Sequence, residues 1–313
     1  MLHTSVHAAP SAQKRRSIFA EGNWELYLLL LPALLLLIVF KYIPMNGVVI
    51  AFQDYNIFEG ILGSSFTGFE NFKRAFDNPD FYRALWNTLF INFYKLCFYI
   101  PLPILIALML NEVRKRAFRS TVQTIIYLPH FLSWIIVGGI FVNLLSVNTG
   151  MVNDWIRSMG LPPVKFMYDP NVFPHVIIFS SMWKEIGWGA IVYLAALSAI
   201  DPQLYEAARM DGASRLKQIL HITIPSLSGT IVIVTLTSLG NVMNNSFEQI
   251  LVMYNPAVYE VADVLNTYVY RQGIGQMEYG YSSAIGLFNS VVSLLLVVGA
   301  NMLCKKFLDR SLW

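Results

Sequence analysis

Long apolar runs constrain this chain more than any other feature of its sequence. Six runs share this property, and they cover residues 26–50, 85–110, 122–146, 172–200, 226–253 and 282–304. At 1.5 Å of rise per helical residue, each run is long enough to cross a hydrocarbon core of about 30 Å. Hydrophobic residues make up 56% of the 313 residues, which is too apolar for a soluble domain. The sequence therefore predicts an all-α membrane protein with six transmembrane helices.

Prolines and cysteines refine this expectation. Pro101, Pro103 and Pro129 fall inside apolar runs, where proline removes a helical hydrogen bond, so kinks are expected there. Cys97 and Cys304 lie within or at the end of such runs, and we expect them to be packing residues rather than a disulfide.

The basic residues predict the orientation of the helices. With the N-terminus in the cytoplasm, most of them face the cytoplasm, namely Lys14, Arg15, Arg16, Arg114, Lys115, Arg116, Arg119, Arg209, Arg215, Lys217, Lys305, Lys306 and Arg310. The outer loops then hold only Lys73, Arg74, Arg83, Arg157, Lys165 and Arg271. This bias follows the positive-inside rule and places both termini in the cytoplasm.

The chain is expected to divide into three parts. Residues 1–24 form a cytoplasmic tail, residues 25–84 the first transmembrane helix with an outer loop, and residues 85–313 the core with helices 2–6. The first apolar run is too long for the core of a signal peptide, so we expect it to be retained.

Residues 201–225 form the most charged stretch between two apolar runs. Asp201 followed by Pro202 is typical of a helix N-cap with proline at the first helical position. Gly212 can adopt the left-handed conformation that turns the chain back. The stretch therefore predicts a short helix, a bend and a second short helix on the cytoplasmic side.

This stretch also resembles a known motif. Glu206-Ala207-Ala208, Asp211-Gly212-Ala213, Ile222 and Ile224-Pro225 are similar, at this spacing, to the EAA loop of permease subunits of binding-protein-dependent ABC importers. The resemblance implies that a coupling helix lies between helices 4 and 5 and docks in a groove of a cytoplasmic ATPase. The coupling residues would be Glu206, Ala207, Ala208, Asp211 and Gly212. The alternative is an amphipathic surface helix that only ends a hairpin.

The resemblance extends over nearly everything after residue 24. The residues Gly68 to Phe72, Phe81, Asn87 and Thr88 are similar to the entry of the core of carbohydrate-type permeases, and the chain most resembles the polysaccharide type, which includes an importer of alginate oligosaccharides. This implies a multi-pass subunit of the bacterial inner membrane. Its partners would be a second homologous permease, two ATP-binding-cassette subunits and an extracytoplasmic binding protein.

Polar residues recur inside the fifth apolar run. They stand at intervals of three and four, which places them on one face of a helix, with Val242, Met243, Phe247 and Ile250 pointing away; the polar set is Ser238, Asn241, Asn244, Asn245 and Glu248. Unpaired polar groups are costly in lipid, so this face is expected to meet protein or water. It is either a sugar-binding wall or a set of hydrogen bonds between helices.

A second polar group lies in the fourth run. It comprises Trp183, Lys184, Glu185 and Trp188, of which Lys184 and Trp188 share a helical face suited to a sugar ring. Lys184 is expected to meet a carboxylate of an acidic sugar, or else to pair with a neighbour such as Glu248. Lys95 in the second run either joins the substrate pathway or extends towards an interface.

The last outer loop, residues 254–273, holds Tyr259, Tyr268 and Tyr270. Tyrosines at such a position either contact a binding protein or form an aromatic belt at the membrane surface.

Several kinds of chemistry have no sequence pattern in this chain. It contains no G-x-x-x-x-G-K-[ST], so ATP and Mg²⁺ are expected on a partner ATPase and no cofactor on this chain. The histidines lack ligand spacing, and no metal site or catalytic residue is predicted.

The sequence thus predicts a transport subunit rather than an enzyme. The substrate would be an oligo- or polysaccharide, either acidic, such as alginate, or neutral. The alternative is an ion-coupled secondary transporter, for which Glu248, Glu185 and Lys184 would be the coupling groups.

Overall fold

The computed structural model describes residues 24–243 and 246–308 and divides the chain into two compact units, residues 1–49 and 50–313. The described part of the first unit is helical. It contains α1 (Trp24–Leu37) and the π-helical turn Ile38–Tyr42, and it includes the start of the 3₁₀ segment Ile43–Phe52.

The second unit begins with a two-stranded hairpin. Strand β1 (Gln53–Asp54) pairs antiparallel with β2 (Ser65–Phe66), so that Gln53 stands opposite Phe66. The short helix α2 (Gly60–Gly63) lies between them.

The other elements of this unit follow in chain order: α3 (Glu70–Asp77), α4 (Pro79–Tyr99), α5 (Pro101–Glu112), α6 (Arg116–Tyr127), a 3₁₀ turn (Leu128–Phe131), α7 (Trp134–Leu144), α8 (Met151–Ser158), α9 (Phe173–Ser198), α10 (Pro202–Met210), α11 (Arg215–Gln218), a π-helical turn (Ile219–Thr223), α12 (Ile224–Asn241), α13 (Phe247–Met253), a 3₁₀ turn (Pro256–Val258), α14 (Tyr259–Ala262), α15 (Leu265–Tyr270), a π-helical turn (Arg271–Gly275) and α16 (Tyr279–Leu308).

Four of the described helical stretches are long and apolar enough to cross a membrane. They are Tyr27–Phe52, Pro79–Glu112, Arg215–Gly240 and Tyr279–Lys306. A fifth span results if the bent pair Arg116–Phe131 and Trp134–Leu144 counts as one. The prediction of a helical membrane protein is confirmed, although the chain also contains the hairpin of β1 and β2. The expected six spans are not confirmed, because only four or five of the described helical stretches are long and apolar enough.

The remaining expected span, residues 172–200, forms the 26-residue helix α9. This helix is long enough, but it is not among the helices that are apolar enough in the described part of the chain. The physical reason is its polar middle, where Ser180, Ser181, Lys184 and Glu185 follow closely on one another.

The expectation of one helix over residues 226–253 is wrong in two respects. The helical stretch already begins at Arg215, so the second short helix of the charged segment runs directly into this span. At the other end, α12 finishes at Asn241, and α13 begins only at Phe247. Gly240 and the asparagines that follow it are weak helix formers, which accounts for the interruption.

Prolines mark two interruptions, as predicted. α4 ends at Tyr99 and α5 begins at Pro101, within a single 34-residue span. Pro129 lies in the 3₁₀ turn between α6 and α7, whose axes differ by 102°.

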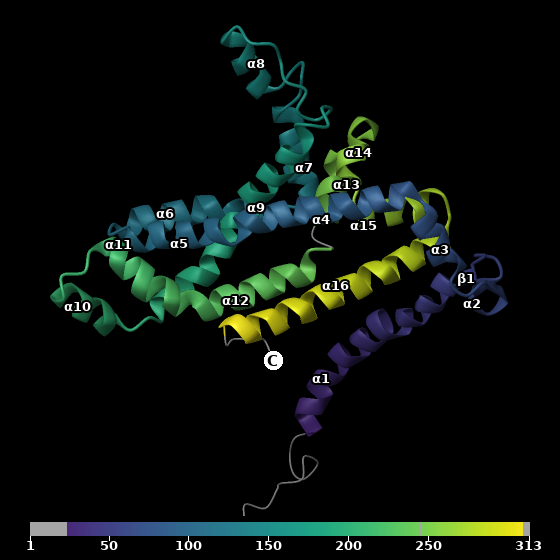
Figure 1. Cartoon of the computed structure of the whole chain (residues 1–313), viewed down its shortest axis with the longest axis horizontal. Helices are drawn as coiled ribbons and strands as arrows, with labels where there is room; N and C mark the ends of the chain where they lie inside the picture. Colours follow the sequence, from purple (N-terminus) through teal and green to yellow (C-terminus); the bar gives the residue numbers. More distant parts are fainter. Residues whose placement is uncertain (1–23, 244–245, 309–313) are drawn as a thin grey trace, which may run out of the picture. The chain divides into compact units, whose positions relative to one another are not determined.

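The helices of the second unit pack around buried apolar clusters. One cluster joins α5, α9 and α12 through residues such as Ala107, Tyr193 and Leu227. α9 also approaches α6 closely at Gly187, where an added Cβ would lie 1.9 Å from the carbonyl oxygen of Ile126. α12 and α16 run side by side (Figure 1). This packing holds α9 against the helices that form the site described below.

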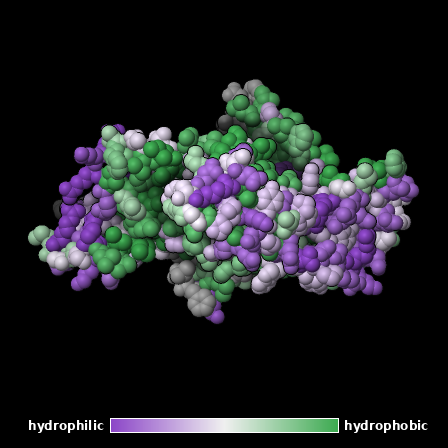
Figure 2. Space-filling model, turned by 90° about the horizontal axis from the view of Figure 1, so that it is seen from above, coloured by the Kyte–Doolittle hydropathy of each residue, from purple (hydrophilic) through white to green (hydrophobic). Residues whose placement is uncertain are grey.

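Helices α10 and α11 lie at one end of this unit (Figure 1). In the space-filling view, that end is hydrophilic and adjoins a band of hydrophobic residues (Figure 2). Charged α10 and α11 therefore stand beyond the apolar surface that a membrane would cover.

Candidate functional site

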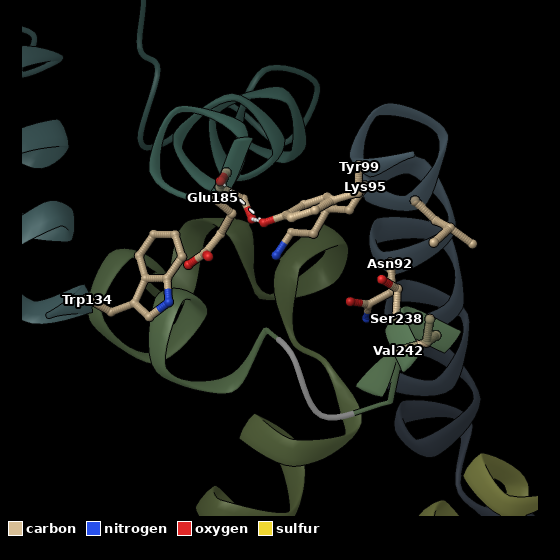
Figure 3. Close-up of a pocket in the computed structure, with 9 residues that line it drawn as sticks. Asn92, Lys95, Tyr99, Trp134, Glu185, Ser238 and Val242 are labelled. Carbon is tan, nitrogen blue, oxygen red and sulfur yellow. Dashed lines mark hydrogen bonds between the residues drawn. The ribbon is translucent and has the colours of Figure 1, made fainter. Parts of the chain in front are cut away.

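A polar cavity of about 230 Å³ lies between helices α4, α7, α9 and the end of α12 (Figure 3). Its lining residues are Asn92, Lys95, Leu96, Tyr99, Trp134, Ser181, Glu185, Ser238 and Val242. The lining combines one amide, three hydroxyls, one cation, one carboxylate and an indole ring, which are groups that can recognise a saccharide.

Helical spacing explains why α4 contributes several of these residues. Asn92, Lys95, Leu96 and Tyr99 stand at i, i+3, i+4 and i+7 and so share one face. Other aromatic side chains of α4 lie outside this face and are exposed, with Trp86 at 67% and Phe93 at 68%. α4 is therefore amphipathic, with its polar face towards the cavity.

The same spacing occurs in α9. Ser181, Lys184, Glu185 and Trp188 stand at i, i+3, i+4 and i+7. Ser181 and Glu185 line the cavity, and the Ser181 hydroxyl lies 2.9 Å from the hydroxyl of Tyr99 on α4. This hydrogen bond joins the two walls across the cavity.

Lys95 is the centre of a buried hydrogen-bond network. Its ammonium, on a side chain only 4% exposed, donates to Ser246 Oγ at 3.0 Å and to Gln249 Oε1 at 2.6 Å. The Ser246 hydroxyl donates in turn to Asn92 Oδ1 at 3.0 Å. Gln249 Nε2 donates to the Ile177 carbonyl oxygen at 2.6 Å. The network therefore holds the start of α13 against both α4 and α9.

Glu185 belongs to a second cluster. His130 Nδ1 lies 2.7 Å from Glu185 Oε2, and because an ionised carboxylate only accepts hydrogen bonds, the proton is assigned to Nδ1. The Lys184 ammonium lies 3.3 Å from Glu185 Oε1 and donates to the His130 carbonyl oxygen at 2.7 Å. Trp188 stacks on the His130 ring, with centroids 4.4 Å apart. This cluster ties α9 to the turn between α6 and α7.

The structure brings only part of the predicted pathway to the cavity. Lys95 lines it, and Lys184 lies behind Glu185 rather than in the wall. Trp188 stacks on His130, and Trp183 packs on Phe141 with its side chain 42% exposed. The proposed pairing of Lys184 with Glu248 is not seen, because Lys184 pairs with Glu185.

The predicted polar stripe of the fifth run is not one continuous helical face. Ser238 lines the cavity at the end of α12, while Glu248 is exposed on α13. Val242 was expected to point away but lines the cavity. Asn244 and Asn245 lie outside the described residues, as does the side chain of Asn241.

Several residues of the site are not predicted from the sequence. They are Asn92, Tyr99, Trp134, Ser181, Ser246 and Gln249. Steps of three and four along the helix from Lys95 and from Glu185 would have found Asn92, Tyr99 and Ser181. Trp134, Ser246 and Gln249 come from other elements, and no local spacing connects them to the site.

The charged segment has the predicted local geometry. Asp201 caps α10, its carboxylate accepting from the Gln203 amide at 2.9 Å, and Gly212 has a φ of 73°. Glu206, Ala207, Asp211 and Gly212 are exposed, and Ala208 is partly buried. Arg215 holds the segment to the end of α5 through Glu112, with Nε 3.1 Å from Oε1.

Residues 259–276 and the start of α4 form a separate polar cleft of about 330 Å³. Arg271 Nη2 lies 2.5 Å from Asp263 Oδ2, and the guanidinium carbon of Arg271 lies 4.9 Å from the centre of the Tyr259 ring. Burial raises the pKa of Asp263, against the opposing effects of Thr267 and Arg271. Tyr268 is fully buried and Tyr270 is 44% exposed, so at least Tyr268 is a packing residue.

Residues 24–243 and 246–308 contain no candidate metal site. No group of three or more His, Cys, Asp or Glu side chains in this part of the chain is arranged to hold an ion.

Apolar helices around a polar cavity define a helical membrane protein with a polar interior. Residues 99–308 match the family described as binding-protein-dependent transport system inner membrane component, and the chain belongs to this family.

Curated relatives extend the match over almost the whole chain. Protein LplB of Bacillus subtilis (strain 168) is 46% identical over 94% of this chain and 92% of its own length. The polygalacturonan/rhamnogalacturonan transport system permease protein YteP of the same organism is 44% identical, over 96% of this chain and 94% of its own length.

A solved structure has the same fold. A chain of a bacterial alginate ABC transporter, in complex with an alginate pentasaccharide-bound periplasmic protein, superposes with a TM-score of 0.85 and is 41% identical, covering 93% of this chain and 97% of its own. This protein is therefore an inner-membrane component of a binding-protein-dependent transport system, similar to permease subunits of sugar and oligosaccharide ABC importers. The comparisons give no support to the alternative of an ion-coupled secondary transporter.

Proposed function

We propose that this permease subunit carries an acidic oligosaccharide through the cavity between α4 and α9, driven by ATP hydrolysis on a separate ATPase. The observation that carries the proposal is the position of Lys95, whose buried ammonium lines the cavity and is hydrogen-bonded to neutral partners, Ser246 and Gln249. A charge-assisted hydrogen bond to a substrate carboxylate is the strongest single polar contact that such a wall offers.

The names of similar proteins agree with an acidic substrate. YteP is named for polygalacturonan and rhamnogalacturonan, and a solved alginate importer is described as importing an acidic polysaccharide, with a chain 42% identical to this one. Uronic acid carboxylates are common to these polymers. A neutral sugar is the competing outcome, since Glu185 also faces the cavity.

Other residues are assigned to the same pathway. Trp134 offers an aromatic face within the cavity, suited to the apolar side of a sugar ring. The sequence pattern also assigns to the substrate pathway Asn241, Asn244, Asn245, Glu248, Trp183, Lys184 and Trp188. Of these residues, Lys184 acts through Glu185, because it pairs with that carboxylate and does not line the cavity.

Coupling to ATP is assigned to the exposed α10–α11 segment. Glu206, Ala207, Ala208, Asp211 and Gly212 would meet a groove of the ATPase. Leu204, 49% exposed, and Met210, 88% exposed, add apolar area on α10 that a partner would cover. Closure of two ATPases would then move this helix and its counterpart in a second permease, and so switch the cavity between two open states.

The complete importer would contain a second homologous permease, two ATP-binding-cassette subunits and an extracytoplasmic binding protein. ATP and Mg²⁺ would bind the ATPase subunits only. In this assembly both termini and α10 face the cytoplasm, with residues 1–24 as a tail, 25–84 as the first helix and outer loop, and 85–313 as the permease core.

Uptake into proteoliposomes that contain the complete importer tests the substrate assignment. Lys95→Gln removes the cavity cation, so uptake of an oligogalacturonate should fall about tenfold or more, the scale of one charge-assisted hydrogen bond. Lys73→Gln, which removes a cation from the exposed surface of α3, is the matched control and should leave uptake unchanged. Full uptake by Lys95→Gln would contradict the assigned role of Lys95.

A further inference from the structure

The carboxylate of Glu185 is held from behind by two donors. His130 Nδ1 donates to Oε2 at 2.7 Å, and the Lys184 ammonium lies 3.3 Å from Oε1. The Lys184 side chain is 7% exposed and its ammonium also lies 5.6 Å from the centre of the Trp134 ring. Both oxygens of Glu185 therefore have positively polarised partners on the side away from the cavity.

Lys95 differs from Glu185 in this respect. Its hydrogen-bond partners, Ser246 and Gln249, are neutral, so they orient the ammonium without cancelling its charge. Figure 3 shows the Lys95 ammonium and the Glu185 carboxylate both directed into the space between α4 and α9. Two opposite charges that face one small cavity would largely cancel unless one of them is compensated elsewhere.

We propose that Lys184 is a specificity-determining residue, which neutralises Glu185 and thereby leaves Lys95 as the dominant charge that an incoming saccharide meets. His130 completes the arrangement by fixing the orientation of the Glu185 carboxylate. Lys184 acts through Glu185 and is a positioning residue, because it does not line the cavity. The inference rests on the proposed function, since it explains how a cavity with one carboxylate in its wall accepts an anionic substrate.

The same cluster could also have a purely structural role, which is to hold α9 to the turn between α6 and α7. Lys184 also donates to the carbonyl oxygen of His130, which lies in the 3₁₀ turn at the 102° bend between α6 and α7. A purely structural ion pair would have the same contacts and would only hold α9 to this turn. The two roles differ in one respect: a structural pair has no preference for the charge of the substrate.

Substrate charge therefore provides the test. The complete importer, with Lys184→Met, Glu185→Gln or both changes in this chain, is reconstituted in proteoliposomes with its binding protein. Initial uptake of an oligogalacturonate and of its methyl ester is measured and expressed as the ratio of variant to wild type for each substrate. This ratio removes the preference of the binding protein from the comparison. Lys165→Met, which removes an exposed cation from an outer loop, is the matched control.

Lys184→Met should lower uptake of the acidic substrate about tenfold relative to wild type, since it leaves the Glu185 charge uncompensated, while uptake of the ester changes little. Glu185→Gln should preserve acidic uptake, and adding it to Lys184→Met should restore most of the loss. Equal losses for both substrates, or a double variant without restored acidic uptake, would overturn the inference and leave a structural pair.

The proposed function fails differently. If the wild-type importer prefers the ester to the acid, the acidic substrate class is wrong and the inference falls with it. If wild type prefers the acid and Lys184→Met keeps that preference, only the role of Lys184 is overturned. Thermal unfolding of each variant shows whether a loss of uptake reflects loss of folded protein.

Discussion

The α10–α11 segment exposes its functional candidates, whereas the cavity between α4 and α9 buries them. Glu206 and Asp211 point to solvent, while the side chains of Lys95 and Gln249 are 4% and 0% exposed. The exposed segment is shaped by neighbours in sequence, through the Asp201 cap and the left-handed Gly212. The cavity is shaped by residues far apart in sequence, such as the pair Lys95 and Gln249.

The two regions should therefore respond differently to substitutions. The α10–α11 segment, shaped by neighbours in sequence, should keep its structure when the rest of the bundle is altered. A substitution of one of its exposed side chains should affect only its binding to a partner. A cavity assembled from several helices depends on their packing, so a distant contact can remove it.

The largest effect is expected at the packing contact behind the cavity. Gly187→Ala adds a Cβ 1.9 Å from the Ile126 carbonyl oxygen, which forces α9 away from α6 and should destabilise the fold by about 3 kcal/mol or more. Gly286→Ala in α16 meets nothing within 4 Å and is the control. Thermal unfolding in detergent measures both, and an unchanged midpoint for Gly187→Ala would contradict the described packing of α9.

A smaller effect, without loss of folding, is expected in the exposed segment. Glu206→Ala removes an exposed carboxylate, so the thermal midpoint should stay unchanged while ATP-coupled uptake falls about tenfold, as for a residue central to an interface. Gln203→Ala, on the same helix and also exposed, is the matched control. Coupled uptake at the wild-type rate in Glu206→Ala would mean that α10 only ends a helical hairpin.

The smallest effect is expected at the cap of α10. Asp201→Ala removes the acceptor for the Gln203 amide and should cost about 1 kcal/mol of local helix stability. Hydrogen exchange of the α10 amides should accelerate accordingly, with no change in the amides of α9. Asp201→Asn keeps an acceptor at the cap and should exchange like wild type. Faster hydrogen exchange throughout the bundle would show that the stability of α10 does not depend only on its neighbours in sequence.

The same contrast explains how much the sequence predicts. Apolar run length locates most of the helices, and Asp201, Pro202 and Gly212 predict the α10 region because cap and turn chemistry acts over a few residues. The sequence does not predict that the span already begins at Arg215, because Pro225 suggests the start of a new helix. In the structure, the π-helical turn Ile219–Thr223 before Pro225 keeps the stretch helical.

The cavity is harder to predict for a physical reason. Lys95 and Lys184 attract attention as charges within apolar runs, but their partners come from other elements. The break after Asn241 turns an expected helical stripe into two short pieces that face different surroundings. Spacing along one helix does not contain this information, because it depends on how the helices pack.

The most direct test of the account is a purification in detergent with this chain as bait, followed by ATPase assays of the resulting complex. The account predicts that an ATPase and a second permease copurify, and that hydrolysis rises only when a binding protein loaded with an acidic oligosaccharide is added. A chain that purifies alone and shows transport driven by an ion gradient without ATP would contradict it.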